Sequence, residues 1–149
     1  MATTDARIIG RVTFEQMRGY WPLQTKDATG VRDHLNEVRK YVLSRTLRDP
    51  AWERSTVLRG PLLEVRKLKA QPGKDIVVTG SMSLMPEPIA GGVVEEYRLF
   101  VYPVVLGRGR RLFADATSAP KRRLAEARPF RCRIVLLRYR TAGERGEPA

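Results

Sequence analysis

Three short segments of the sequence combine residue types that could bind phosphate groups. They are residues 10–13 (GRVT), 44–46 (SRT) and 80–83 (GSMS). Glycine lets a backbone approach a ligand closely, and the start of a helix offers unpaired N–H groups to phosphate oxygens. An arginine guanidinium adds two parallel hydrogen bonds to a phosphate. Together the segments predict a site for an elongated phosphorylated ligand, such as a dinucleotide.

The hydrophobic pattern places each of these segments directly after a strand. Apolar runs at residues 6–9, 41–43 and 76–79 indicate buried strands, and helical spacing follows the first and the last. In an open α/β sheet, ligands bind beyond the carboxyl ends of the strands. Glycine and threonine at such a junction are also ordinary helix caps, so each segment alone has a purely structural interpretation.

The first half of the chain is predicted to alternate between strands and helices. Helices are expected at residues 13–20, 31–38 and 61–69, the first of them with a capping box between Thr13 and Gln16, and a further strand at 56–58. The order strand–helix–helix–strand–strand–helix–strand indicates a mainly parallel sheet flanked by helices. Two prolines, Pro86 and Pro88, predict that the next helix is short, kinked or displaced.

The second half is predicted to be antiparallel. Strands are expected at residues 97–101, 121–128 and 134–139, and the lack of helices between them favours antiparallel strands added to the edge of the sheet. Residues 141–149 have the composition of a flexible tail. The whole chain, residues 1–149, is therefore expected to be one α/β domain.

The charge of the chain is strongly basic. There are 28 Lys and Arg residues against 16 Asp and Glu, a net charge of 28 − 16 = +12. Such a surplus could attract nucleic acid. However, the basic residues are spread along the chain, and the sequence holds no recognition helix, zinc finger or aromatic RNA-binding motif. A solvated basic surface is the favoured interpretation, and a nucleic-acid-binding module is a hypothesis that rests on charge alone.

Several classes of protein are excluded by composition. With one cysteine, Cys132, and one histidine, His34, the chain has neither a disulfide nor a Cys/His zinc site, and no metal is expected. The uncharged stretch at residues 99–107 is far shorter than the roughly 20 residues of a membrane span, and no secretory signal is found, so a cytoplasmic protein is expected. Cys132, Trp21 and Trp52 are interpreted as packing residues, and His34 as a structural residue.

Four segments in order resemble one family. They are residues 10–15 (GRVTFE), 41–47 (YVLSRTL), 75–84 (DIVVTGSMSL) and 95–113 (EEYRLFVYPVVLGRGRRLF). The chain resembles the dihydrofolate reductase-like superfamily, specifically the reductase domain at the C-terminus of bacterial bifunctional riboflavin deaminase-reductases and its stand-alone relatives. The resemblance extends over residues 5–139. Members of this family begin with a further strand and a Ser-Leu-Asp-Gly-like loop. This sequence is therefore expected to be an N-terminally short member, either a truncated form or one with a wrongly chosen start, and to have an open sheet edge.

The resemblance implies that NADPH lies across the strand ends. The residues it assigns to the cofactor are Gly10, Arg11, Thr13, Ser44, Arg45, Thr46, Gly80, Ser81 and Ser83. The first three would hold phosphates, with Arg11 a candidate for the 2′-phosphate. Ser44 and Arg45 would flank the adenosine ribose, with Thr46 beside them, and the last three would receive the pyrophosphate and nicotinamide side. No side chain is assigned a catalytic role.

The resemblance implies an NADPH-dependent oxidoreductase that acts on a pteridine- or pyrimidine-like small molecule. The expected reaction is hydride transfer to 5-amino-6-(5-phosphoribosylamino)uracil in riboflavin biosynthesis, with dihydrofolate reduction second. Relatives of this kind are usually dimers, so a homodimer is expected. The alternative is a catalytically impaired remnant of the fold that binds a nucleotide or a partner chain through the same edge.

Overall fold

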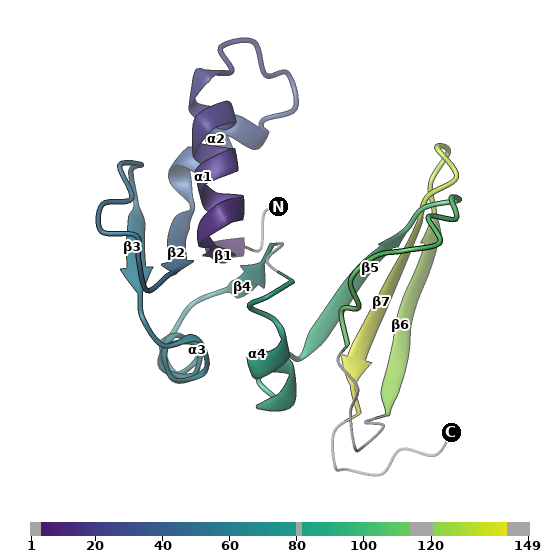
Figure 1. Cartoon of the computed structure of the whole chain (residues 1–149). Coiled ribbons are helices and arrows are strands. Elements are labelled where there is room, and N and C mark those ends of the chain that lie inside the picture. The colour runs from purple at the N-terminus through teal and green to yellow at the C-terminus, as the bar shows by residue number, and fades with distance from the viewer. Residues whose placement is uncertain (1–3, 80–81, 114–120, 143–149) are drawn as a thin grey trace. The chain divides into compact units, whose positions relative to one another are not determined.

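The structure of the protein is a computed structural model that describes residues 4–79, 82–113 and 121–142. The chain divides into two units, Met1–Gly91 and Gly92–Ala149. The first holds a parallel sheet with helices, and the second holds antiparallel strands (Figure 1). The predicted α/β class, with a helix-flanked parallel sheet and antiparallel C-terminal strands, is confirmed.

Four parallel strands form the sheet of the first unit. They are β1 (Thr4–Gly10), β2 (Arg39–Leu43), β3 (Ser55–Leu58) and β4 (Asp75–Val78), in the order β3-β2-β1-β4. All four predicted strands are confirmed. Their Ile and Val side chains favour strands because they pack well on a pleated surface. β1 lies between β2 and β4, and its Gly10 is in register with Leu43 of β2.

The helices follow the predicted order. They are α1 (Arg11–Tyr20), α2 (Val31–Glu37), α3 (Pro61–Lys69) and α4 (Pro86–Ala90), with a single 3₁₀ turn, η1 (Trp21–Leu23), after α1. The predicted capping box is wrong, because α1 begins at Arg11 and its N-cap is Gly10, which leaves Thr13 inside the helix. The strand runs directly into the helix, since Gly10 still has an extended backbone (φ −75°, ψ 155°).

The helix α4 is short, as the two prolines predicted. It has five residues and begins at Pro86. Proline is tolerated in the first turn because its missing N–H would have no partner inside the helix. The helix therefore starts where a proline can be placed and ends one turn later.

A hydrophobic cluster packs between one face of the parallel sheet and the first two helices. Its buried members are Ile9, Phe14, Leu35, Val42 and Trp52. The rings of Phe14 and Trp52 lie 5.6 Å apart, and Trp21 packs against the cluster from outside. Both tryptophans are thus packing residues, as predicted.

A lysine is buried beside this cluster. The ammonium of Lys40 donates hydrogen bonds to the carbonyl oxygens of Leu35 (2.6 Å) and Val38 (3.0 Å), at the end of α2, and lies 4.7 Å from the centre of the Trp52 ring. Its side chain is fully enclosed. Burial disfavours the charged form and lowers the pKa of Lys40 to about 8.

The buried ammonium makes the stability of the fold depend on pH. The unfolded chain holds this proton up to about pH 10.4, whereas the folded chain releases it near 8, so unfolding takes up a proton between those values. We expect the free energy of unfolding to rise by about 3 kcal/mol across this window, relative to Lys40→Met. Urea unfolding of both proteins at pH 7, 8, 9 and 10 measures it. If the free energies of unfolding of the two proteins changed equally with pH, the hydrogen bonds to the two carbonyls would offset the effect of burial.

The second unit contains a three-stranded antiparallel sheet. Its strands are β5 (Glu96–Val101), β6 (Arg122–Pro129) and β7 (Val135–Thr141), in the order β5-β7-β6. The predicted strands are confirmed, but not their addition to the edge of the parallel sheet. Among the described residues these strands pair only with one another, because β7 provides both of its edges to β5 and β6.

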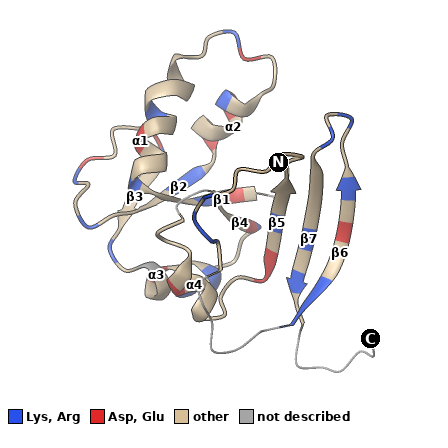
Figure 2. Cartoon of the chain, turned by 45° about the vertical axis from the view of Figure 1, so that its right-hand side comes forward, with Lys and Arg blue, Asp and Glu red and all other residues tan. Residues whose placement is uncertain are grey.

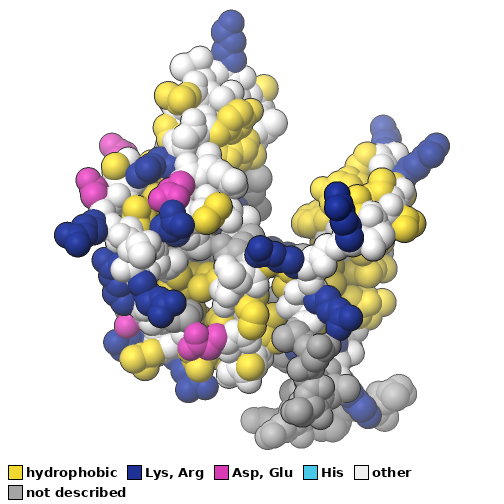
Figure 3. Space-filling model, viewed as in Figure 1, with side chains coloured by type: hydrophobic (Ala, Val, Ile, Leu, Met, Phe, Trp, Pro, Cys, Tyr) yellow, Lys and Arg dark blue, Asp and Glu magenta, His cyan; other side chains and the backbone are white. Residues whose placement is uncertain are grey.

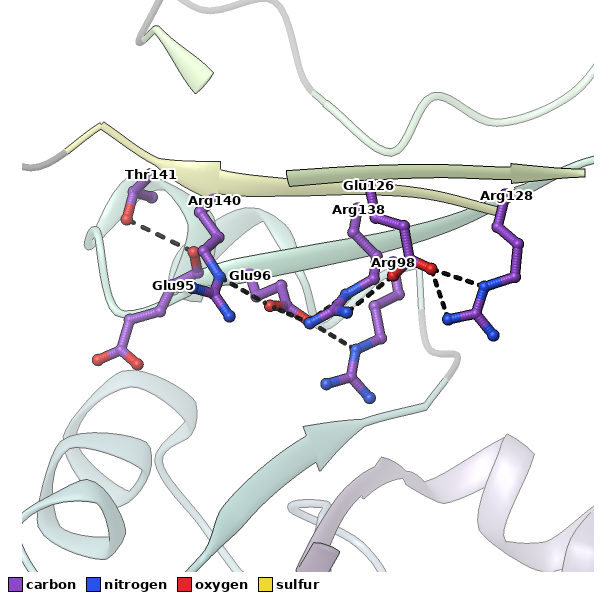
Figure 4. A network of polar contacts seen from close by, with 8 residues as sticks. All are labelled: Glu95, Glu96, Arg98, Glu126, Arg128, Arg138, Arg140 and Thr141. Carbon is purple, nitrogen blue, oxygen red and sulfur yellow. Dashed lines mark hydrogen bonds and ion pairs between the residues drawn. The ribbon is translucent and has the colours of Figure 1, made fainter. Parts of the chain in front are cut away.

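One face of this sheet carries a network of charges (Figure 4). The carboxylate of Glu96 accepts hydrogen bonds from Arg98 (2.7 Å), Arg138 (3.0 Å) and Arg140 (3.1 Å), and Arg138 also donates to Glu126 (2.8 Å). These bonds, that from Arg138 foremost, lower the pKa of Glu96 to about 2. Figure 2 shows basic and acidic residues alternating along β6. The network joins all three strands through their side chains.

The interpretation of Cys132 as a packing residue is wrong. Its side chain is exposed in the connection between β6 and β7. The turn begins one residue after Pro129, and Arg133 adopts a left-handed backbone there (φ 66°). Cys132 therefore lies at the tip of the hairpin and not in the strand that follows.

Candidate functional site

Three neighbouring strands bring the predicted segments to one edge of the parallel sheet. Gly10 ends β1, Ser44 follows β2, and Thr79 follows β4, immediately before the third segment. These strands are adjacent and parallel, so their carboxyl ends lie at the same edge. Gly80 and Ser81 lie outside the described residues. Ser83 is exposed in the turn between β4 and α4.

The start of α1 is suited to an anion. Its N-cap, Gly10, is buried and provides no side-chain cap to the first turn. The unpaired N–H groups and the positive end of the helix dipole favour negative charge there. Arg11 is exposed and forms an ion pair with Glu15 one turn later (2.8 Å). Thr13 is half-buried and has an interaction of its own.

The loop after β2 is held by its own serine. The Ser44 hydroxyl oxygen accepts hydrogen bonds from the backbone N–H groups of Leu47 (2.9 Å) and Thr46 (3.2 Å). Arg45 and Thr46 are exposed, and Arg45 has no hydrogen bond or ion pair within the described residues. The loop thus presents the Arg45 guanidinium, whose N–H donors are available, while the hydrogen bonds to Ser44 fix the shape of the loop.

Comparison with known proteins decides the family. Residues 1–136 match the RibD C-terminal domain. The chain belongs to the RibD C-terminal domain family. The chain is 33% identical over 142 residues to the uncharacterized protein YyaP of Bacillus subtilis (strain 168), an alignment that covers 93% of this chain and 75% of YyaP. It is 27% identical to YwjB of the same organism over 134 residues, which covers 86% of this chain and 69% of YwjB.

Solved structures have the same fold. One, "Putative riboflavin biosynthesis protein" from Shewanella sp. PV-4, has a TM-score of 0.74 at 16% identity and covers 95% of this chain and 76% of its own. Another, a pyrimidine reductase-like protein from Corynebacterium diphtheriae, has a TM-score of 0.65 at 16% identity over 95% of this chain and 77% of its own. The RibD C-terminal domain family is reductase-like and generally NADPH-dependent.

One arginine of the site in this RibD-family chain was not found from the sequence. Arg59 directly follows β3, and its guanidinium donates to the carbonyl oxygens of Ser44 (2.9 Å) and Leu47 (3.0 Å). It therefore holds both ends of the loop that carries Arg45. The available signal is its position, since Arg59-Gly60-Pro61 follows a fourth predicted strand, beside the three strand ends of the candidate site.

A second arginine lies within the sheet near the same edge. Arg7 of β1 donates to the hydroxyl of Thr79 (2.8 Å), and its Nη2 lies 3.4 Å from Nε2 of His34. Partial burial lowers the pKa of Arg7. Burial, together with the charge of Arg7, lowers the pKa of His34. His34 is half-buried in α2, consistent with the structural role expected of it.

Two classes of feature are not found in the described part of the chain. Residues 4–79, 82–113 and 121–142 contain no group of three or more His, Cys, Asp or Glu side chains that could hold a metal ion. Over the same residues, no helix has the length and apolar character needed to cross a membrane.

Removing the Arg59 guanidinium should loosen the loop after β2. In Arg59→Met the carbonyls of Ser44 and Leu47 lose their charged donor, a cost of about 1 kcal/mol at an exposed site. We expect amide hydrogen exchange at Thr46 and Leu47 to accelerate about fivefold. The matched control is Arg48→Met, since Arg48 is exposed and has no bond within the described residues. Equal exchange in both variants would contradict this role of Arg59.

Proposed function

We propose that this chain is an NADPH-dependent reductase of riboflavin biosynthesis that transfers hydride to 5-amino-6-(5-phosphoribosylamino)uracil. The observation that carries the proposal is the adjacency of the parallel strands β2, β1 and β4, whose carboxyl ends lead into the three phosphate-type segments. Ligands of open α/β sheets bind at this edge. Membership of a reductase-like family supports the same chemistry.

The residues at the edge fit a phosphorylated cofactor. The first turn of α1 has no side-chain cap, and backbone N–H groups there would donate hydrogen bonds to a phosphate oxygen. Arg45 would meet the 2′-phosphate, because its guanidinium has no partner within the described residues. Arg11 would contribute charge while bonded to Glu15. Ser44 and Arg59 would act on the cofactor only through the shape of their loop.

The chain's part in the reaction would be binding and orientation. When bound, NADPH would supply the hydride, so no nucleophilic side chain is required. The substrate must be held with its reacting carbon about 3–3.5 Å from the hydride donor. A pyrimidine substrate is favoured over a pteridine because a solved relative of the same fold is described as pyrimidine reductase-like.

Cofactor preference tests the assignment of Arg45. The chain should bind NADPH more tightly than NADH, because only NADPH carries the 2′-phosphate. Arg45→Gln should weaken the binding of NADPH about tenfold or more, which is the effect of losing one charged hydrogen bond. The affinity for NADH should stay nearly unchanged. Calorimetric titration with both nucleotides measures this. Arg123→Gln removes the same charge from β6 and should change neither affinity. Equal affinities for the two nucleotides in the unaltered protein would overturn the assignment.

Turnover tests the proposed reaction itself. The absorbance of NADPH is followed with the phosphoribosylamino-uracil as substrate, and with dihydrofolate in a parallel assay. Oxidation that depends on the uracil supports the proposal. Tight binding of NADPH without turnover of either substrate would instead favour a catalytically impaired nucleotide-binding remnant of the fold.

We also propose that the chain forms a homodimer through the segment that follows β5. Val104, Val105 and Leu106 are 64%, 98% and 79% exposed. Figure 3 shows hydrophobic side chains gathered on the part of the molecule that holds β5 to β7. Chains with a net charge of +12 repel one another, so copies associate most readily through a surface without charge, and residues 99–107 have none.

The dimer should depend on this apolar segment. Light scattering at micromolar concentration should give a mass twice that of the 16.9 kDa chain. Val105→Asp should give monomer, because it places a charge in the contact. Leu63→Asp, at an exposed leucine of α3, is the control and should stay dimeric. A monomeric unaltered protein would refute the proposal.

A further inference from the structure

A pocket lies at the opposite edge of the parallel sheet from the candidate site. Its volume is about 390 Å³, and its lining residues are Arg39, Tyr41, Arg54, Ser55 and Thr56. Small-molecule sites usually have roughly 300–1,000 Å³. Arg39 and Ser55 are the first residues of β2 and β3, so the pocket lies at the amino-terminal ends of the strands.

The two arginines of the pocket have most of their donors unused. Arg39 donates to the Asp5 carboxylate at 3.3 Å, and Arg54 donates to the backbone carbonyl of Glu37 at 3.1 Å. A guanidinium has five N–H donors, and neither has another bond within the described residues. Two charged donor groups therefore line one small space.

The hydroxyl groups of the pocket add further donors. Tyr41 and Thr56 are in register on β2 and β3, which places them on the same face of the sheet. Neither hydroxyl has a hydrogen-bond partner within the described residues. Ser55 makes only a long bond, 3.4 Å, to the carbonyl of Glu53. Guanidinium and hydroxyl donors thus line this pocket, and most of them have no acceptor within the described residues.

The backbone holds Arg54 in an uncommon conformation. Its φ is +54°, in the left-handed region that non-glycine residues rarely adopt. Its carbonyl accepts a bond from the N–H of Lys40 at 2.8 Å, while its guanidinium is bonded to Glu37. Main chain and side chain are thus both fixed at the rim, and strain of this kind concentrates at ligand sites.

We propose that this pocket binds a phosphate group, either inorganic phosphate or the phosphate of a small monoester. Paired guanidinium groups match the geometry of phosphate oxygens, and hydroxyls complete the set of donors. The volume exceeds that of the phosphate itself and leaves space for an attached small polar group such as a sugar.

The pocket is independent of the proposed reductase site. A five-residue strand such as β2 is about 16 Å long, and the two sites lie at its opposite ends. Phosphate binding here would therefore persist in the presence of saturating NADPH. Failure of one proposal leaves the other standing.

The test is a titration of the whole chain followed by amide chemical shifts. Inorganic phosphate and ribose 5-phosphate are each added at constant ionic strength, with chloride as the reference anion, first without NADPH and then with it. Saturable shifts are expected at Arg39 and at residues 54–56. Arg39→Gln and Arg54→Gln should each weaken binding about tenfold. Arg123→Gln is the control, an exposed arginine of β6 without a bond in the described residues, and should leave binding unchanged.

The outcomes distinguish the source of the phosphate. Tighter binding of ribose 5-phosphate identifies a phosphorylated metabolite as the occupant, and equal binding identifies free phosphate. Chemical shifts that do not saturate, or an equal loss of phosphate affinity in Arg123→Gln, would overturn the proposal. Either result would report only the general positive charge of the chain. Circular dichroism of the variants confirms that each one is folded.

Discussion

The strand β1 hydrogen-bonds in parallel to β2 on one side and to β4 on the other. Parallel strands present all their carboxyl ends at one edge and all their amino ends at the other. The carboxyl ends of β1, β2 and β4 therefore lie at one edge, although they are far apart in the sequence. The same constraint separates them from the pocket that begins at Arg39 and Ser55. Two possible ligand sites thus follow from one pattern of strand pairing.

Arginine serves several different purposes in this chain. Arg138 is bonded to two carboxylates and holds antiparallel strands together. Arg59 is bonded to two carbonyls and holds a loop. Arg45 is exposed and has no bond within the described residues, so its donors are available. A count of charge treats these side chains alike, whereas their partners determine which of them can bind an anion.

The buried ammonium of Lys40 joins α2 to the sheet. It donates hydrogen bonds to two carbonyl oxygens at the end of the helix, where a positive charge also interacts favourably with the helix dipole. The backbone N–H of the same residue donates to the carbonyl of Arg54, which lines the pocket at the amino-terminal ends of β2 and β3. The lysine thus connects the core to the rim of that pocket through one residue of β2.

The sequence by itself determined the strands, the helices and the strand ends that carry Gly10, Ser44 and the third segment, because hydrophobic periodicity and turn residues act over a few neighbouring positions. It also predicted the short α4, since Pro86 and Pro88 act on the helix that contains them. Only the tertiary structure decided that Arg59 holds the Ser44 loop and that Lys40 is buried. It likewise decided that the last three strands pair with one another and that Cys132 is exposed. These outcomes depend on where strands and loops lie after the chain has folded, and the hydrophobic pattern of one segment does not encode the partner it will meet.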